Sequence, residues 1–142
     1  MDITSANSSV TLITALTPAG LKFEKYSADS AWSQDNYENV EHRMGVDGKM
    51  AVGFTPVEKS ITFTFEADSP TLDGLDLIWQ TTEATKAPIV ANMVMTIPSI
   101  KKTISLSNGV LVGYKLIPNS DRVLAPKEAT FVFESVNSVP LA

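Results

Sequence analysis

Alternation of apolar and polar side chains predicts that most of this chain forms β-strands. The clearest run is 60–67, in which Ile61, Phe63 and Phe65 share one face and polar side chains occupy the other. Successive side chains of a strand point to opposite faces of a sheet, so this run indicates a strand with one buried face. The same kind of pattern predicts further strands at 9–15, 21–26, 31–34, 101–106, 110–117 and 129–136.

Three other stretches have patterns that predict a buried strand, a hairpin turn and a loose terminal segment. Residues 89–97 are apolar at almost every position, which is typical of a strand covered on both faces. The pair Asn108-Gly109 stands between two strand-like runs and predicts a hairpin turn, because such pairs readily take the positive φ angles of tight turns. The last residues, NSVPLA at 137–142, are expected to be a loose end or a docking arm.

One segment has the periodicity of a helix instead. At about 100° per residue, an apolar stripe forms that can pack on a sheet. Its members are Leu72, Leu75, Ile78, Trp79 and Thr82. Ser69 is expected to cap the helix, with Pro70 in the first turn, and Lys86 precedes the break at Pro88. The prediction is an amphipathic helix from about Pro70 to Lys86. Leu77 falls off the stripe and is either a singly exposed leucine or a contact with another subunit.

A long hairpin is predicted at 38–54, where two strand-like arms meet at Gly45-Val46-Asp47-Gly48. The Asp47-Gly48 pair suits a tight tip, and Gly45 and Gly53 add backbone freedom. The arms carry Val40, Met44, Met50, Val52 and Phe54, with Glu38, Glu41, His42, Arg43 and Lys49 between them. A hairpin of this kind needs cover, either from its own domain or from another molecule.

Together these elements predict about seven or eight strands and one helix. The expected fold class is mainly β, a β-sandwich or partly closed barrel with the helix across one opening. The chain has 142 residues, and no repeat, low-complexity segment or linker divides it. A single domain spanning residues 1–142, with the hairpin projecting from it, is the expected organisation.

Composition excludes several kinds of chemistry. The chain has no cysteine and one histidine, so disulfides, thiolate zinc sites, cysteine nucleophiles and histidine-rich metal sites are excluded. The net charge is −5, and no basic run is longer than Lys101-Lys102, which argues against a surface that grips nucleic acid. DNA could still slide past an acidic surface. No membrane span is expected, since no run of 18 apolar residues occurs, and no secretory signal is expected, since the N-terminus lacks a basic region followed by an apolar block.

No catalytic constellation emerges from the remaining residues. His42 has no partners for a triad and is interpreted as a solvated or interface histidine. Carboxylate pairs such as Asp73 with Asp76 are interpreted as solvated faces. Neither of the common phosphate-binding glycine motifs occurs. No cofactor and no metal are expected, and the pattern is typical of an assembly protein without enzymatic activity.

Most of the chain resembles the tail tube proteins of tailed bacteriophages. The likeness spans about 40–136 and is carried by 44–49, 67–72, 108–118 and 134–136. It implies a structural subunit of a six-membered ring, and stacked rings form a hollow tube through which DNA passes on ejection. The implied fold is a β-sandwich-like domain with a helix at its side, similar to the type VI secretion tube protein.

The resemblance also implies where such a subunit meets its neighbours. Family members reach the neighbouring ring with a long loop or hairpin, and 41–54 is the matching stretch. The implied self-assembly residues are Glu41, His42, Arg43, Met44, Gly45, Val46, Asp47, Gly48, Lys49 and Met50. The candidate lumen acids are Glu38, Glu41, Asp47 and Glu66. Leu77 is the candidate outer contact, where a sheath would dock.

The implied partners are further copies of the chain, a tail sheath, a tape measure protein and baseplate or tail-tip proteins. DNA is implied only as passing cargo. The implied location is the phage tail, assembled in the host cytoplasm. A contractile tail is the favoured type, and a non-contractile tail is the alternative. The alternative is a monomeric β-sandwich that decorates a virion or binds a receptor, with Trp32 and Tyr37 in an exposed aromatic cluster. A third reading, an enzyme with two carboxylates facing across a cleft, lacks a recognisable motif.

Overall fold

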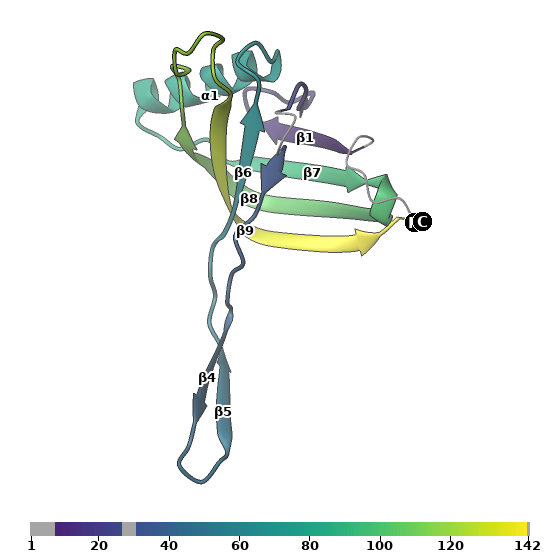
Figure 1. The fold of residues 1–142 in the computed structure, drawn as a ribbon, viewed down its shortest axis with the longest axis vertical. Helices are drawn as coiled ribbons and strands as arrows, with labels where there is room; N and C mark the ends of the chain where they lie inside the picture. Colours follow the sequence, from purple (N-terminus) through teal and green to yellow (C-terminus); the bar gives the residue numbers. More distant parts are fainter. Residues whose placement is uncertain (1–7, 27–30, 142) are drawn as a thin grey trace.

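The computed structural model describes residues 8–26 and 31–141. Seven strands form one antiparallel sheet in the order β2-β1-β7-β8-β9-β6-β3, and two more form a separate hairpin, β4-β5 (Figure 1). The sheet strands are β1 Ser9–Thr14, β2 Leu21–Lys22, β3 Trp32–Ser33, β6 Lys59–Phe65, β7 Ala91–Ile97, β8 Lys102–Tyr114 and β9 Lys127–Pro140. The remaining elements are β4 Val40–Met44, β5 Met50–Phe54, the helix α1 Thr71–Thr85 and the short 3-10 helix η1 Pro98–Ile100. The predicted fold class, mainly β with one α-helix, is confirmed.

The two longest strands give the sheet its shape. β8 and β9 bend along their length, so each runs through both halves of the sheet (Figure 1). β7 pairs with β8 over 102–109, whereas β6 pairs with β9 over 127–133. The sheet therefore wraps around a core without closing. The segment after β2 crosses from β1 to β6 and so spans the open side of the sheet. The Phe23 N–H donates to the Val10 carbonyl of β1, and Tyr26 forms a bridge with Phe65 of β6.

This crossing explains why the strand predicted at 21–26 is shorter than expected. Only Leu21–Lys22 is a regular strand, and it pairs with Thr11 and Leu12 of β1. At Lys25 the backbone turns through a positive φ of 55° on its way to β6. Alternation marks the side chains that enter the core, but it does not show that a segment changes its pairing partner.

Aromatic side chains fill the core between the two halves of the sheet. The rings of Phe23 and Phe63 meet edge to face, with centroids 4.9 Å apart, and Phe23 meets Phe65 in the same way at 5.2 Å. Such contacts add to the free energy gained by removing the rings from water. The buried apolar residues are Val10, Leu12, Phe23, Ile61, Phe63, Phe65, Leu72, Leu75, Ile78, Ala91, Met93, Met95, Leu106, Ala129, Phe131 and Phe133.

α1 lies across one end of the wrapped sheet (Figure 1) and buries the predicted stripe. Leu72, Leu75 and Ile78 are buried, and Trp79 is half-buried beside Tyr114. The helix ends at Lys86, which takes the left-handed conformation two residues before Pro88. The amphipathic helix predicted from the sequence is therefore present with its apolar face on the sheet.

The predicted role of Ser69 as helix cap is wrong. The residue flanking the helix is Pro70, no side chain caps the first turn, and the Ser69 hydroxyl donates to the Glu24 carbonyl. Thr71 reinforces this attachment, since its hydroxyl accepts from the Glu24 N–H at 2.7 Å and donates to the Lys22 carbonyl at 3.1 Å. Both hydroxyls thus attach the start of α1 to the segment 22–24, which follows β1 toward β6.

The hairpin predicted at Asn108-Gly109 is also wrong, because β8 runs through both residues. Asn108 does take a positive φ, 53°, but it forms a bulge. Ala91 pairs with Gly109 while Met93 pairs with Leu106, so β8 holds one extra residue against β7. The Asn108 N–H donates to Asn92 Oδ1 at 3.1 Å, which fills the gap in the ladder.

Two further expectations about the sheet are corrected. β7 is not covered on both faces, because Ala91, Met93 and Met95 are buried while Val94 is 39% exposed. The tail is not loose over 137–140, since these residues extend β9 and pair with 102–105 of β8. Leu141 continues the contact by donating its N–H to the Lys101 carbonyl at 2.9 Å. Residue 142 lies outside the described residues.

Candidate assembly interface

The β4–β5 hairpin projects from the body along the longest axis of the molecule (Figure 1). All ten of its strand residues are exposed. Residues paired directly across an antiparallel ladder lie on the same face. One face therefore holds the pairs Val40 with Phe54, His42 with Val52 and Met44 with Met50, and the other holds Glu41 with Gly53 and Arg43 with Ala51.

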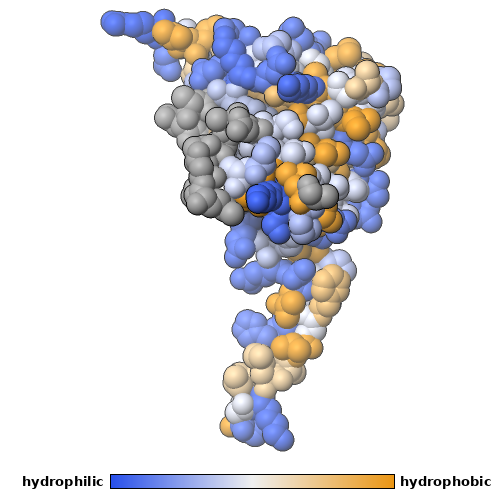
Figure 2. Space-filling model, turned by 90° about the vertical axis from the view of Figure 1, so that its right-hand side faces the viewer, coloured by the Kyte–Doolittle hydropathy of each residue, from blue (hydrophilic) through white to orange (hydrophobic). Residues whose placement is uncertain are grey.

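The first of these faces, called here the apolar hairpin face, consists of Val40, His42, Met44, Met50, Val52 and Phe54. Its apolar side chains are between 54% and 71% exposed. Figure 2 shows apolar atoms following the hairpin well beyond the body. A two-stranded ribbon of this kind has little stability in water without a partner surface. The exposure of these apolar side chains makes this face the candidate assembly surface of the subunit.

The hairpin tip is held by its own backbone. The Gly45 N–H donates to the Lys49 carbonyl at 2.7 Å, and the Gly48 N–H donates to the Gly45 carbonyl at 3.0 Å. Gly48 has a φ of 82°, and Asp47 Oδ1 accepts from the Lys49 N–H at 3.1 Å. The side chain of Asp47 thus stabilises the turn. Val46 at the tip is fully exposed.

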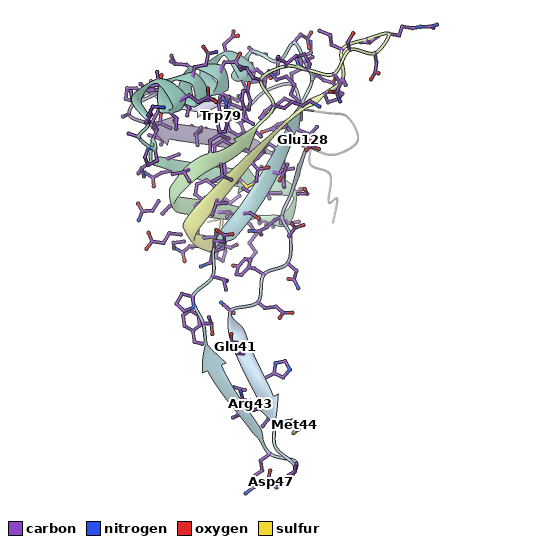
Figure 3. All side chains as sticks on the ribbon, turned by 90° about the vertical axis from the view of Figure 1, so that its left-hand side faces the viewer. Glu41, Arg43, Met44, Asp47, Trp79 and Glu128 are labelled. Carbon is purple, nitrogen blue, oxygen red and sulfur yellow. The ribbon has the colours of Figure 1, made fainter. Side chains whose placement is uncertain are left out.

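The four candidate lumen acids do not come together in one subunit. Glu38, Glu41 and Asp47 are exposed on the hairpin or its base, whereas Glu66 follows β6 and is half-buried. Figure 3 shows Glu41, Arg43, Met44 and Asp47 along the hairpin, far from Trp79 and Glu128 on the body. Because β6 runs away from the hairpin, Glu66 lies at the opposite end of the body (Figure 1).

Leu77, the candidate outer contact, lies on the solvent side of α1. Its side chain is 51% exposed, while Leu75 and Ile78 on either side of it in the sequence are buried. It is the one large apolar residue on the exposed side of α1, next to Asp73 and Gln80, which are also exposed.

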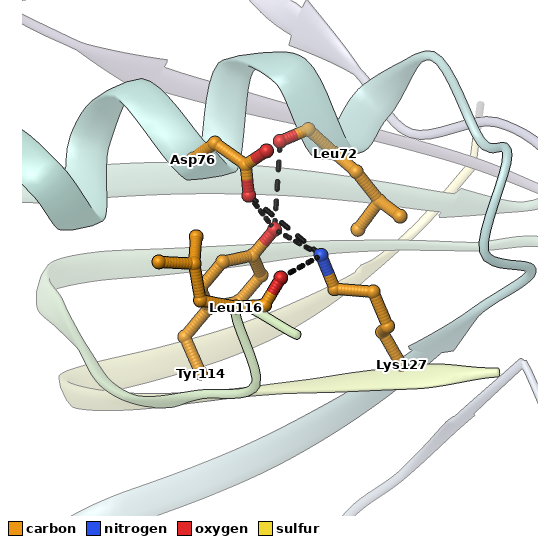
Figure 4. A network of polar contacts seen from close by, with 5 residues as sticks. All are labelled: Leu72, Asp76, Tyr114, Leu116 and Lys127. Atoms are coloured by element: carbon orange, nitrogen blue, oxygen red, sulfur yellow. Dashed lines mark hydrogen bonds and ion pairs between the residues drawn. The ribbon is translucent and has the colours of Figure 1, made fainter. Parts of the chain in front are cut away.

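A buried lysine forms a polar network that the sequence did not reveal (Figure 4). Lys127 Nζ donates to the Leu116 carbonyl at 3.0 Å and to the Tyr114 hydroxyl at 3.3 Å, and it lies 3.8 Å from Asp76 Oδ1. The Tyr114 hydroxyl donates to the Asp76 carboxylate and reaches the Leu72 carbonyl at 3.5 Å. The network ties α1 to β8 and β9.

The Tyr114 hydroxyl is the link of this network between α1 and the sheet, because it donates to Asp76 and accepts from Lys127. Burial, and next the hydrogen bond to Asp76, raise the pKa of Tyr114 well above its usual range. One signal could have identified the lysine, since Lys127 is in phase with Ala129, Phe131 and Phe133, which are buried.

Over 8–26 and 31–141, no group of three or more histidine, cysteine or acidic side chains could hold a metal ion. In that part of the chain no helix has the length and apolar character needed to cross a membrane.

Several solved structures contain a chain of similar fold, among them the following three. A chain of the anti-feeding prophage baseplate, symmetrised six-fold, has a TM-score of 0.64 at 15% identity, covering 99% of this chain and 97% of that chain. A chain of the sheath-tube complex of the extracellular contractile injection system PVC, in the extended state, has a TM-score of 0.65 at 13% identity, covering 99% and 93%. A chain of the anti-feeding prophage tube-terminating cap has a TM-score of 0.59 at 13% identity, covering 99% and 92%.

The TM-scores show that these chains share the fold, and at identities this low the likeness extends to the fold alone. The resemblance to tail-tube-like proteins is thus confirmed at the level of the fold, over almost the full length of each chain. No curated protein sequence matches the chain. A family model described as Tail fiber protein gp32 matches residues 1–137. Since this match covers nearly the whole sequence, the chain belongs to the tail fiber protein gp32 family.

Proposed function

We propose that the chain is a structural, non-enzymatic subunit of a phage tail tube, which assembles into stacked hexameric rings around a conduit for DNA ejection. The observation that carries the proposal is the fold shared with a chain of a sheath-tube complex, over 99% of this chain and 93% of the other. A similar fold over nearly the whole of both chains supports a similar place in a tube.

The sheet offers an edge that suits ring formation. β6 pairs with β9 only as far as Phe133, so residues 134–140 of β9 pair on one side, with β8, among the described strands. A free edge of this length is a template for another strand unless something covers it. In a closed ring each subunit covers such an edge of its neighbour.

The hairpin would connect successive rings. Residues 41–50 form its distal part, and both of its faces are exposed along their length. Burying the apolar hairpin face against another subunit would contribute roughly 1.5–3 kcal/mol for each large side chain that is fully covered. Stacking therefore supplies the cover that this element lacks in a single subunit.

The remaining parts of the proposal concern the surroundings of the tube. Its setting is a contractile tail, with a sheath, a tape measure protein and baseplate or tail-tip proteins as partners, assembled in the host cytoplasm. Leu77 is the proposed sheath contact. Glu38, Glu41, Asp47 and Glu66 are proposed to face the lumen. The net charge of −5 fits a conduit that repels DNA and does not hold it.

The test is the mass of the protein as a function of concentration, measured by light scattering. The wild type is expected to grow into species of six chains and multiples of six. Deleting Gly45 to Lys49 is expected to leave rings that do not stack, with an unchanged circular dichroism spectrum. A wild type that stays monomeric at every concentration would overturn the proposal.

The description of the family as a tail fiber protein favours a second candidate. In that role the chain would be a virion module that binds a receptor, and it would need an exposed recognition surface. Of the two aromatic residues expected there, Tyr37 is 37% exposed, while Trp32 is half-buried with its ring centroid 5.8 Å from that of Tyr26. A monomer in the mass measurement would favour this candidate.

A further inference from the structure

Exposed apolar side chains gather at both ends of the long axis. One group is the apolar hairpin face. The other belongs to residues 115–126, which connect β8 to β9 beside α1, at the end of the body farthest from the hairpin tip (Figure 1). In this connection Ile117 and Val123 are each 78% exposed, and Leu124 is 53% exposed. Neither group can cover the other within one subunit.

A groove lies beside the second group. Its lining residues are Glu66, Ala67, Asp68, Val123 and Leu124, and its volume is about 300 Å³. Residues 66–68 contribute two acids to the lining, and Val123 and Leu124 contribute apolar side chains. The Asp68 carboxylate is paired with Lys25, whereas Glu66 has no ion-pair partner among the described residues. The groove thus presents an acid next to apolar side chains.

The hairpin tip has the complementary chemistry. The outermost residues, 43–49, contain two basic side chains, Arg43 and Lys49, and one acid, Asp47, and the next acid along the arm is Glu41. Asp47 is engaged in the turn, where it accepts the Lys49 N–H. Met44, Val46 and Met50 supply exposed apolar surface beside the two cations.

We propose that the hairpin tip of one copy docks in the groove formed by Glu66, Val123 and Leu124 of a second copy. Two different surfaces at opposite ends make a head-to-tail contact, which repeats without closing and so builds a stack. A tip-to-tip contact would instead bring like charges together. The inference rests on the proposed stacking, and it gives Glu66 a role in docking that differs from lining the lumen.

A charge exchange tests the ion pair. Lys49→Glu alone and Glu66→Lys alone are each expected to raise the concentration needed for stacking by roughly fivefold. Combining them restores an opposite-charge pair at every junction, so the double variant is expected to stack nearly as well as the wild type. Glu128→Lys is the matched control, because Glu128 is exposed outside the groove. A double variant weaker than both single variants would overturn the docking site.

Disulfide trapping tests the contact directly, since the chain has no cysteine. Val46→Cys and Val123→Cys variants, mixed, assembled and oxidised, are expected to cross-link several-fold more than Val46→Cys mixed with Leu77→Cys. A disulfide requires Cα atoms within about 7 Å, so cross-linking reports close contact. Stacks in which Val46→Cys links to itself or equally to Leu77→Cys would refute the docking site alone. A wild type that never assembles would refute the proposed function as well.

Discussion

Gly109 on β8 faces Phe133 on β9, and the phenyl ring fills the space where a side chain at position 109 would lie. The two residues are paired in the ladder, and a Cβ on Gly109 would be 2.2 Å from Phe133 Cδ1. Phe133 is fully buried, so its ring has little room to move. The bulge at Asn108 and the glycine after it therefore allow β8 to pass over the core.

Gly109→Ala is accordingly expected to lower the free energy of unfolding by about 1–3 kcal/mol, because the new methyl group forces the ring or the strand to shift. Chemical denaturation followed by circular dichroism measures the change. Gly53→Ala is the control, since a Cβ at Gly53 meets nothing within 4 Å. Equal effects of the two substitutions would show that the packing against Phe133 is not the cause.

The network around Lys127 predicts a loss of stability when its acid is removed. Asp76→Ala leaves the Tyr114 hydroxyl and the buried ammonium group of Lys127 without their carboxylate partner. The expected loss is about 1–3 kcal/mol. Glu83→Ala, about two turns further along α1 on its exposed side, is the matched control and is expected to change stability little. Similar unfolding midpoints for both variants would contradict the structural role of the network.

Alkaline pH is expected to destabilise the fold through Tyr114 and Tyr26. Burial raises the pKa of both hydroxyls above their ordinary range, and at Tyr114 the Asp76 carboxylate adds to the effect. The unfolded chain releases these protons near pH 10. The folded state then holds more protons than the unfolded state, so stability is full below about pH 10 and falls as the pH rises further. Replacing both tyrosines with phenylalanine should reduce this fall in the free energy of unfolding, measured by urea titration at a series of pH values. The same fall with pH in the variant would show that these two tyrosines are not its cause.

The two faces of the hairpin predict opposite responses to similar substitutions. Val52→Ser on the apolar hairpin face is expected to weaken assembly at least several-fold, while Ala51→Ser on the other face is expected to have a small effect. Both positions are exposed in the single subunit, so neither change should shift its unfolding midpoint. Sedimentation of assembled material at several concentrations gives the comparison. Equal losses would show that the two faces are buried alike.

The spacing of apolar residues predicted α1, β6 and β9 well, because local sequence decides the structure of these elements. The stripe of α1 follows from its 3.6-residue repeat, and the alternating phenylalanines of β6 and β9 follow from the pleat. The same phase contains Lys127, which lies two residues before Ala129. The lysine escaped notice because its partners, Tyr114 and Asp76, come from elements distant in the sequence.

The predictions that were wrong also depend on contacts between residues distant in the sequence. Asn108-Gly109 requires a positive φ, but a turn and a bulge both satisfy that requirement, and only the pairing of β7 with β8 decides between them. Ser69 has the chemistry of a helix cap, yet its hydroxyl donates a hydrogen bond to the carbonyl of the distant residue Glu24. The free edge of β9 and the open face of β7 depend on how the sheet wraps. Sequence patterns describe what a side chain can do, and tertiary contacts select among those possibilities.

The central claim is that this chain builds a stacked, six-membered tube. Negative-stain electron microscopy of the purified protein at high concentration tests it most directly. The account predicts hollow rods of uniform width, six-fold ring views, and rings without rods when Gly45 to Lys49 are deleted. Featureless particles of single-subunit size, even with tail-tip extract added as a nucleus, would contradict it.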